Sequence, residues 1–162
     1  MVFIIVIVIV IVWYCQFHFT SVAGLLCSTV MRCEKGWTNF RESCYLRVTT
    51  KLTWPNAQKA CEKNDANLVT VNSEDEMTFL GSLMTGNGGW NGLHLEENGN
   101  TLVWSSGENS DYRNWGMRGS KRQSKLQNCV RMKGLKWSMS RCSIKYKFTC
   151  EKGRYKMKSK VV

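Results

Sequence analysis

Cys33-Glu34-Lys35-Gly36-Trp37 opens a segment in which six cysteines alternate with tryptophans and glycines, and Phe148-Thr149-Cys150-Glu151 closes it. Between these ends the same alternation continues through Cys44-Tyr45, Trp54, Cys61, Trp90-Asn91-Gly92-Leu93, Trp104, Asn114-Trp115, Cys129-Val130, Trp137 and Cys142. Six cysteines permit many sets of three disulfides, and their number does not choose among them. Such a density of cysteines indicates folding in an oxidising compartment.

This order of residues resembles the C-type lectin-like domain, over about residues 33–151. The resemblance implies an α+β fold in which two helices flank antiparallel β-sheets, with a long loop region on one side. It also implies three disulfides: Cys33–Cys44, Cys61–Cys150 and Cys129–Cys142. A metal site is a weak alternative for these cysteines, because the chain has no Cys-x-x-Cys pair and its two histidines, His18 and His94, are far apart.

Two helices are predicted from local signals. The first spans Trp54 to Cys61, with Thr53 placed to cap it and Pro55 in its first turn, where a missing N–H costs little. The second begins at Ser73, which forms a capping box with Glu76. Its core side is predicted to consist of Met77, Leu80, Leu83 and Met84, at helical spacing.

Strands are predicted mainly after the helices. Residues 90–95 and 101–104 read as a hairpin around Asn98-Gly99, and Cys129–Met132 and Ile144–Cys150 read as further strands. The stretch from Gly116 to Asn128 reads as irregular. Helices followed by strands favour an α+β fold over alternating βαβ units. Tryptophans 90, 104, 115 and 137 are expected to be core or loop-anchoring residues rather than a platform for sugars.

The N-terminal segment is strongly apolar from Val2 to Tyr14, and Ser21-Val22-Ala23 fits a cleavage site. We therefore expect a signal peptide at 1–23, a short segment at 24–32, and secretion. The alternative is an uncleaved membrane anchor reaching Met31. Cleavage would leave Cys27 outside the set of six, either as a reactive thiol or as the bridge of a disulfide-linked dimer.

Sugar-binding relatives hold Ca²⁺ with carboxylate and amide oxygens, at positions that this sequence fills differently. Gln127-Asn128 stand before Cys129, Ser138-Met139 follow Trp137, and Gly119-Ser120-Lys121 occupy the place of the family's proline-containing triplet. Ca²⁺ affinity falls as ligand charge is lost, so no cofactor is expected at this site. Glu108-Asn109-Ser110 resembles the triplet but precedes Asn114-Trp115, whereas the family's triplet follows that dipeptide.

Charge is divided unevenly along the chain. Residues 1–112 contain 7 Lys/Arg and 11 Asp/Glu, a net charge of −4, whereas residues 113–162 contain 16 Lys/Arg and only Glu151, a net charge of +15. The predicted ligand-binding residues are Arg118, Lys121, Arg122 and Lys125, in the long loop. Such a patch attracts anionic partners, although a merely solvated face is the alternative. Residues 152–162 are expected to be a disordered basic tail.

The function predicted from these features is a secreted, calcium-independent binding module for a glycan, including sulfated or other anionic glycans, or for a protein. The alternatives are a calcium-dependent carbohydrate-binding lectin with a non-standard site and a type II membrane receptor of the natural killer cell kind. The sequence shows no Ser/His/Asp or Cys/His arrangement and no phosphate loop, which argues against an enzyme. Nucleic acid is not expected as a partner, because an exported protein rarely meets it.

Overall fold

A computed structural model of the chain describes residues 31–84, 88–96, 101–117, 119, 125–153 and 155–156. The elements, in chain order, are β1 (Met31–Arg32), β2 (Thr38–Phe40), β3 (Ser43–Leu52), α2 (Trp54–Glu62), β4 (Asn67–Leu68), α3 (Glu74–Leu83), β5 (Trp90–Leu95), β6 (Leu102–Trp104), β7 (Cys129–Lys133), β8 (Lys136–Ser140), β9 (Tyr146–Gly153) and β10 (Tyr155–Lys156).

The chain divides into two compact units, which are described separately. Residues 33–154 form one unit and contain every element except β1 and β10. Residues 1–32 and 155–162 form the other, in which β1 pairs antiparallel with β10. Within the described ranges, no helix is both long and apolar enough to cross a membrane. The predicted signal peptide and Cys27 lie outside the described residues.

One sheet with the strand order β2-β3-β9-β5-β7-β8 forms the centre of residues 33–154, with β4 paired to β9 and β6 paired to β5. Its longest ladder joins β3 to β9, from Ser43 opposite Gly153 to Leu52 opposite Tyr146. The pairing of β5 with β9 is parallel. The prediction that strands mainly follow the helices is wrong for β3, which precedes α2 and is rich in β-branched residues that favour strands.

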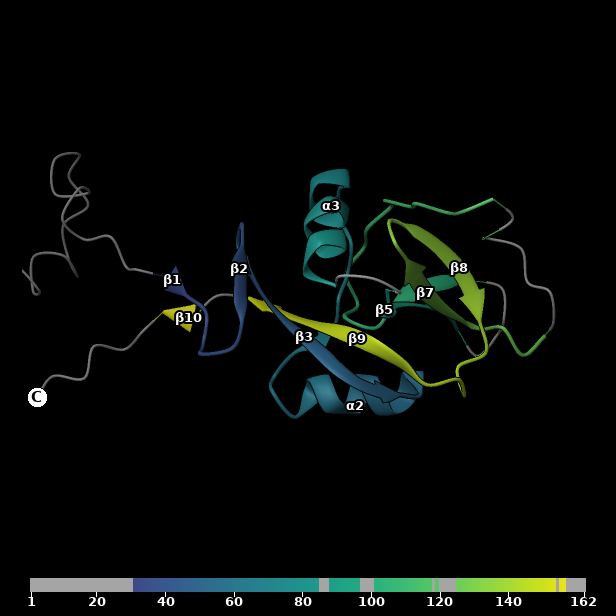
Figure 1. The fold of residues 1–162 in the computed structure, drawn as a ribbon, viewed down its shortest axis with the longest axis horizontal. Helices are drawn as coiled ribbons and strands as arrows, with labels where there is room; N and C mark the ends of the chain where they lie inside the picture. The colour runs from purple at the N-terminus through teal and green to yellow at the C-terminus, as the bar shows by residue number, and fades with distance from the viewer. Residues whose placement is uncertain are drawn as a thin grey trace, which may run out of the picture. The chain divides into compact units, whose positions relative to one another are not determined.

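The two helices lie on opposite sides of the β3–β9 ladder, α3 on one face and α2 on the other (Figure 1). On the α2 side, Ala57 and Cys61 are buried with Leu68, Trp90 and Phe148. On the α3 side, the buried set is Val69, Met77, Leu80, Leu93, Val130 and Trp137, with others. The sheet therefore carries a core on each face, and the α+β fold of the prediction is confirmed.

The helix starts differ in part from their predictions. Thr53 is the N-cap of α2, but its side chain makes no capping hydrogen bond. At α3, the Glu76 N–H donates to Ser73 Oγ at 3.2 Å, as predicted. The reciprocal half of the capping box is wrong, because the Glu76 carboxylate instead accepts from the Asn72 N–H at 2.7 Å. This carboxylate is turned toward β3 and β9.

Replacing Ser73 by alanine is expected to lower the free energy of unfolding by about 1 kcal/mol, because the Glu76 N–H loses its acceptor. Thr53→Ala is the matched control and should change the free energy by less than about 0.5 kcal/mol, since no side-chain bond is lost. Urea titrations of both variants measure the difference. Equal losses would contradict the capping role of Ser73.

Three disulfides link the described cysteines, Cys33–Cys44, Cys61–Cys150 and Cys129–Cys142. These are the pairs that the family resemblance implies. Cys61 lies in α2 and Cys150 in β9, so the second bridge ties a helix to the sheet across a sequence separation of 89 residues. Cys129 and Cys150 are buried, with exposures of 2% and 1%.

Strands β8 and β9 also differ from expectation. No strand was predicted between Met132 and Ile144, but β8 occupies Lys136–Ser140 and forms a hairpin with β7 through Gly134, a residue with a φ of +57° that glycine adopts without strain. The tail prediction is wrong for Lys152, because β9 continues to Gly153 and Lys152 is 9% exposed. Its ammonium group lies 3.0 Å from the Glu34 carboxylate and 4.2 Å from the Trp37 ring centre.

Candidate binding sites

The base of the long loop is held by hydrogen bonds to β8. The Trp137 N–H donates to the Asn114 carbonyl at 2.8 Å, and the Gly116 N–H donates to the Trp137 carbonyl at 3.0 Å. The Trp137 ring is fully buried and meets the rings of Trp104, Tyr112 and Trp115 edge-on, at centroid distances of 5.8, 5.7 and 5.9 Å. These aromatic contacts anchor the base of the long loop to the core, as expected for core or loop-anchoring residues.

The positions that match calcium ligands in the family carry no carboxylate. The Met139 side chain belongs to the core on the α3 side and is 7% exposed, while its N–H donates to the Gly119 carbonyl at 2.9 Å. The Asn128 carbonyl accepts from the Leu95 N–H, which fixes the backbone next to Cys129. A thioether packed in the core is a poor partner for a hard cation, so Met139 contributes to stability instead.

Of the four predicted ligand-binding residues, only Lys125 lies in the described part of the chain, where it is exposed in a turn before β7. Arg118, Lys121 and Arg122 lie outside the described residues. Their grouping in the loop therefore remains a prediction.

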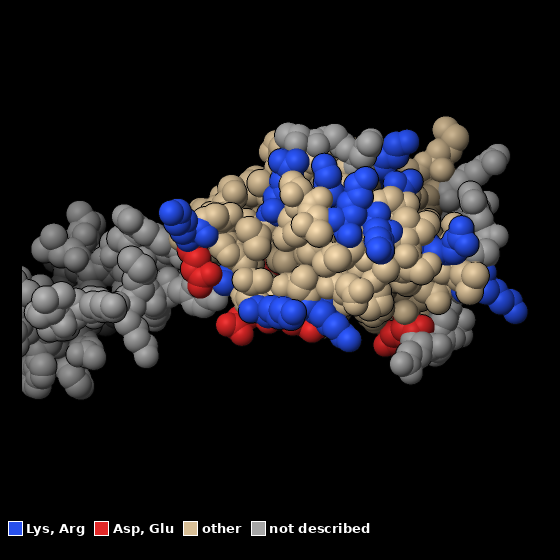
Figure 2. Space-filling model, turned by 60° about the horizontal axis from the view of Figure 1, so that its bottom comes forward, with Lys and Arg blue, Asp and Glu red and all other residues tan. Residues whose placement is uncertain are grey.

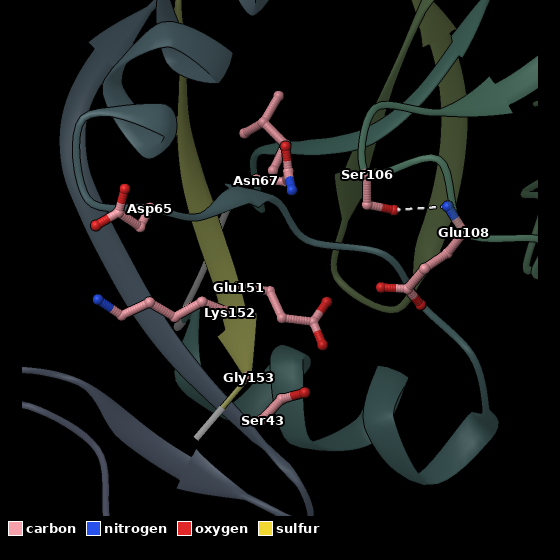
Figure 3. A pocket seen from close by; sticks show the side chains of 9 residues that line it. Ser43, Asp65, Asn67, Ser106, Glu108, Glu151, Lys152 and Gly153 are labelled. Atoms are coloured by element: carbon pink, nitrogen blue, oxygen red, sulfur yellow. Dashed lines mark hydrogen bonds between the residues drawn. The ribbon is translucent and has the colours of Figure 1, made fainter. Parts of the chain in front are cut away.

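A polar cavity of about 230 Å³ lies beside the end of β9. Asp65, Asn67, Ser106, Glu108 and Glu151 are among the residues that line it. The Glu151 and Glu108 carboxylates point toward each other across this hollow, whereas Lys152 points away (Figure 3). A second cavity, of about 250 Å³, lies next to Glu151 and is lined also by Arg41, Tyr45 and Glu76. Glu151 therefore lines both cavities.

The hydroxyl of Tyr45 lies between two carboxylates from distant parts of the chain. It is 2.6 Å from Glu76 Oε1 and 3.2 Å from Glu151 Oε1. A tyrosine hydroxyl carries one proton and can donate it to only one of them. The other contact is a favourable hydrogen bond only if that carboxyl group carries a proton of its own. The geometry therefore favours a state in which Glu76 and Glu151 together carry one proton, in addition to the hydroxyl proton of Tyr45.

The surroundings raise the pKa values of Glu151, Glu76 and Tyr45, which agrees with the proton that the geometry favours. Burial, followed by the nearby charge of Glu76, raises the pKa of Glu151 to about 7, although the Thr70 N–H that donates to Glu151 Oε2 opposes the shift. Burial also raises the pKa of Glu76, against the hydrogen bonds from Tyr45 and Asn72. The pKa of Tyr45 is raised by burial and by both carboxylates. Glu151 is thus the group that takes up a proton near neutral pH.

Glu76 and Glu151 are the carboxylates that could together contribute to a cation site. Within the described ranges, however, no three or more His, Cys, Asp or Glu residues are grouped to hold a metal ion. Ca²⁺ takes six to eight oxygen ligands, and a cation here would also have to displace the proton that the two carboxyl groups share. The pair is therefore described as a proton site.

No sequence signal pointed to this cluster. Tyr45 lies 31 residues from Glu76 and 106 residues from Glu151. The capping-box pattern singled out Glu76 but assigned its carboxylate to the wrong N–H group. The segment Glu108-Asn109-Ser110 has a structural role: Ser110 donates to the Val71 carbonyl, and its own carbonyl accepts from Trp104 Nε1.

Comparison with known proteins agrees with the fold and the disulfides. The family model of the lectin C-type domain matches residues 50–152. The human low affinity immunoglobulin epsilon Fc receptor is 30% identical over 124 residues, which make up 76% of this chain and 38% of the receptor. Snaclec A11 of Macrovipera lebetinus is 30% identical over 131 residues, covering 74% of this chain and 83% of the snaclec.

Among solved structures, human lithostathine has a TM-score of 0.69 at 30% identity, and the match covers 75% of this chain and 99% of lithostathine. The chain thus spans well under half of the Fc receptor but nearly the whole of a one-domain relative. With the matching family model, the shared fold and the three disulfides, the chain belongs to the C-type lectin domain family.

Proposed function

We propose that this chain is an extracellular binding module that recognises an anionic glycan or protein ligand without calcium. The observation that carries the proposal is the ligand set at the long loop, where Met139 is packed in the core and Gln127, Asn128 and Ser138 are uncharged. Members of the family are typically binding modules rather than enzymes. The long-loop residues Arg118, Lys121, Arg122 and Lys125 supply the positive charge that selects an anionic ligand.

The proposal includes export and gives a function to each part of the chain. In it, residues 1–23 act as a signal peptide, 24–32 as a short connection and 33–151 as the binding domain, and Cys27 would link two copies. The similarity to an Fc receptor keeps a membrane-anchored receptor as the second candidate. The N-terminal residue of the mature protein, determined by sequencing, separates the two: cleavage after Ala23 supports secretion, whereas an intact N-terminus supports an anchor.

Millimolar calcium is expected to leave the melting temperature of the domain nearly unchanged. A Kd no tighter than millimolar contributes at most about RT ln 2, or about 0.4 kcal/mol, when calcium equals the Kd. Thermal unfolding with calcium and with chelator measures this effect. A rise of several degrees that chelator reverses would contradict calcium independence.

A second variant locates any calcium effect that is observed. If calcium stabilises the native protein but not Glu151→Gln, the ion binds at the carboxylate pair and the proposal for the long loop stands. If both are stabilised equally, the ion binds elsewhere and the proposal for the long loop is in doubt. Restoring the family's aspartate by Met139→Asp is not an informative reverse test, because it places a charge in the core.

A further inference from the structure

Three basic side chains come together on one face of the β3–β9 ladder. Arg47 is paired with Thr149 across the ladder, so the two side chains share a face. Lys147 lies two residues before Thr149 and points to that same face. The register shifts between Val48 and Leu52, after which Leu52 is paired with Tyr146, so Lys51 lies near Lys147 on the neighbouring strand. Arg47, Lys51 and Lys147 are here called the ladder cations.

Among the described residues no ion pair joins a ladder cation to a carboxylate, and the carboxylate on the same face of the ladder is that of Glu151, which lies diagonally across from Arg47. The chain has no acidic residue between Glu42 and Glu62, and none between Asp111 and Glu151. Two ion pairs join described residues, Arg41–Asp75 and Lys152–Glu34, and neither includes a ladder cation. Across the described part of the chain, Arg47 Nε is also one of the few buried side-chain atoms without a hydrogen-bond partner. Like charges side by side on a ladder are unfavourable, as is a buried donor without an acceptor.

An anion bound to this face would offset the repulsion between the like charges, although it would not reach the buried Nε of Arg47. The ladder cations are arranged along two neighbouring strands, and neither of the two described cavities is lined by any of them. Positions on one face of a strand repeat about every 7 Å, and neighbouring strands lie about 4.8 Å apart. This row suits a ligand that carries negative groups along its length.

The surroundings disfavour other anionic partners. The large hydrophobic side chains that are exposed in the described part are Met117, Leu126 and Leu135, and none lies on β3 or β9. A membrane surface or a protein partner would be expected to use exposed apolar or aromatic anchors. Figure 2 shows Lys and Arg across the upper middle and at the edges of the face that it draws, with Asp and Glu near its left and lower edges.

We propose that the ladder cations form a second binding surface, separate from the long loop, for a linear sulfated polysaccharide. The proposal rests on the proposed function in one respect, namely that the ligand is anionic. Lysine on a sheet edge can also serve to prevent pairing with another chain, which would apply to Lys51. It does not account for Lys147, because β9 lies inside the sheet between β3 and β5.

The test measures heparin affinity of the full domain as a function of salt. The variant Arg47→Gln/Lys51→Gln/Lys147→Gln removes the ladder cations, and Lys35→Gln/Lys59→Gln/Lys63→Gln removes the same charge from exposed positions elsewhere. We expect the first variant to weaken binding at least tenfold at about 0.15 M salt, and the slope of log Kd against log salt to decrease by about 2–3, because fewer counterions are released. The second variant should change the Kd less than threefold.

Further variants keep the proposal and the proposed function distinguishable. If Arg118→Gln/Lys121→Gln/Arg122→Gln/Lys125→Gln weakens binding and the ladder variant does not, the ladder proposal is wrong and the loop function stands. If the ladder variant and its control lose affinity equally, the charge is diffuse and the ladder proposal is wrong. If the native domain does not bind heparin, the ladder proposal is wrong, and so is the proposal that the long loop binds an anionic glycan.

Two more measurements separate heparin recognition from a folding defect and from membrane binding. Lys51→Glu changes one exposed residue, so its loss of affinity supports the surface even if the triple variant unfolds. Vesicles containing phosphatidylserine test the membrane alternative: loss of vesicle binding with unchanged heparin binding would overturn the proposal. A tail deletion, if added, should begin after Lys156, since an earlier end would remove residues of β9 or β10.

Discussion

Replacing Cys150 by serine is expected to prevent the folded domain from accumulating. Its bridge to Cys61 closes a loop across 89 residues, and in the chain-entropy description a loop of this length raises the free energy of the unfolded state by about 4–5 kcal/mol. Both cysteines are almost fully buried, so the serine hydroxyl at position 150, left without a partner beside the free Cys61 thiol, would add a desolvation cost. The total approaches the whole stability of an ordinary domain.

The matched control is the double variant Cys33→Ser/Cys44→Ser. This bridge spans only 11 residues and its loss should cost about 2 kcal/mol less in the same description. We expect that variant to be secreted in folded form with a lower melting temperature. Cys27→Ser, outside the set of six, should fold like the native protein. Yields on a non-reducing gel and circular dichroism measure the outcome. A Cys150→Ser variant as stable as the control would contradict the dominant role of the long bridge.

The melting temperature is expected to fall as pH rises from about 5.5 to about 8. The folded-state pKa of Glu151 is raised to about 7 from an ordinary value of 4.5, so the folded domain binds a proton that the unfolded chain releases. The stabilisation is complete below the unfolded pKa and is lost as pH rises through the folded value. It amounts to about 1–3 kcal/mol, because Glu151 keeps part of its surface exposed.

Glu151→Gln should remove most of this pH dependence and should be more stable than the native protein at pH 8. The amide oxygen can still accept from the Thr70 N–H, while the amide N–H can donate to the hydroxyl oxygen of Tyr45, which itself donates to Glu76. Nearby Glu108 and Arg41 also act on the pair, with opposite signs at Glu76, and remain unchanged in this variant. Glu62→Gln, an exposed carboxylate on α2, is the control. Scanning calorimetry across the range measures the slopes; a native melting temperature that rises with pH would contradict a shared proton.

The parts of the fold that the sequence predicted are those marked by local or repeated signals. Pro55 marks the start of α2, and Ser73 marks that of α3. Met77 and Leu80 are buried where helical spacing placed them. The strand β5 begins at Trp90 as predicted. The fold class came from the order of cysteines and tryptophans, through a resemblance to known domains.

The parts that were missed depend on contacts between distant residues. Strand β8 has its Trp137 and Met139 turned into the core, but its short Lys-Trp-Ser-Met-Ser pattern is too brief to separate from a loop. The Tyr45–Glu76–Glu151 cluster joins β3, α3 and β9, and no spacing in the chain brings these three together before the sheet exists. Lys152 was assigned to the tail because it begins a run of basic residues, whereas its aromatic and acidic partners lie near residue 35.

The position of β9 has a consequence for the order of events during synthesis. This strand pairs with β3, β4 and β5, all of which are made before it. Until β9 leaves the ribosome, β3 lacks its main neighbour and Cys61 lacks its disulfide partner, so the nascent chain carries an open sheet edge and an unpaired thiol. Open edges of this kind favour aggregation. The central sheet and the long disulfide of this domain can therefore be completed only after β9 has emerged.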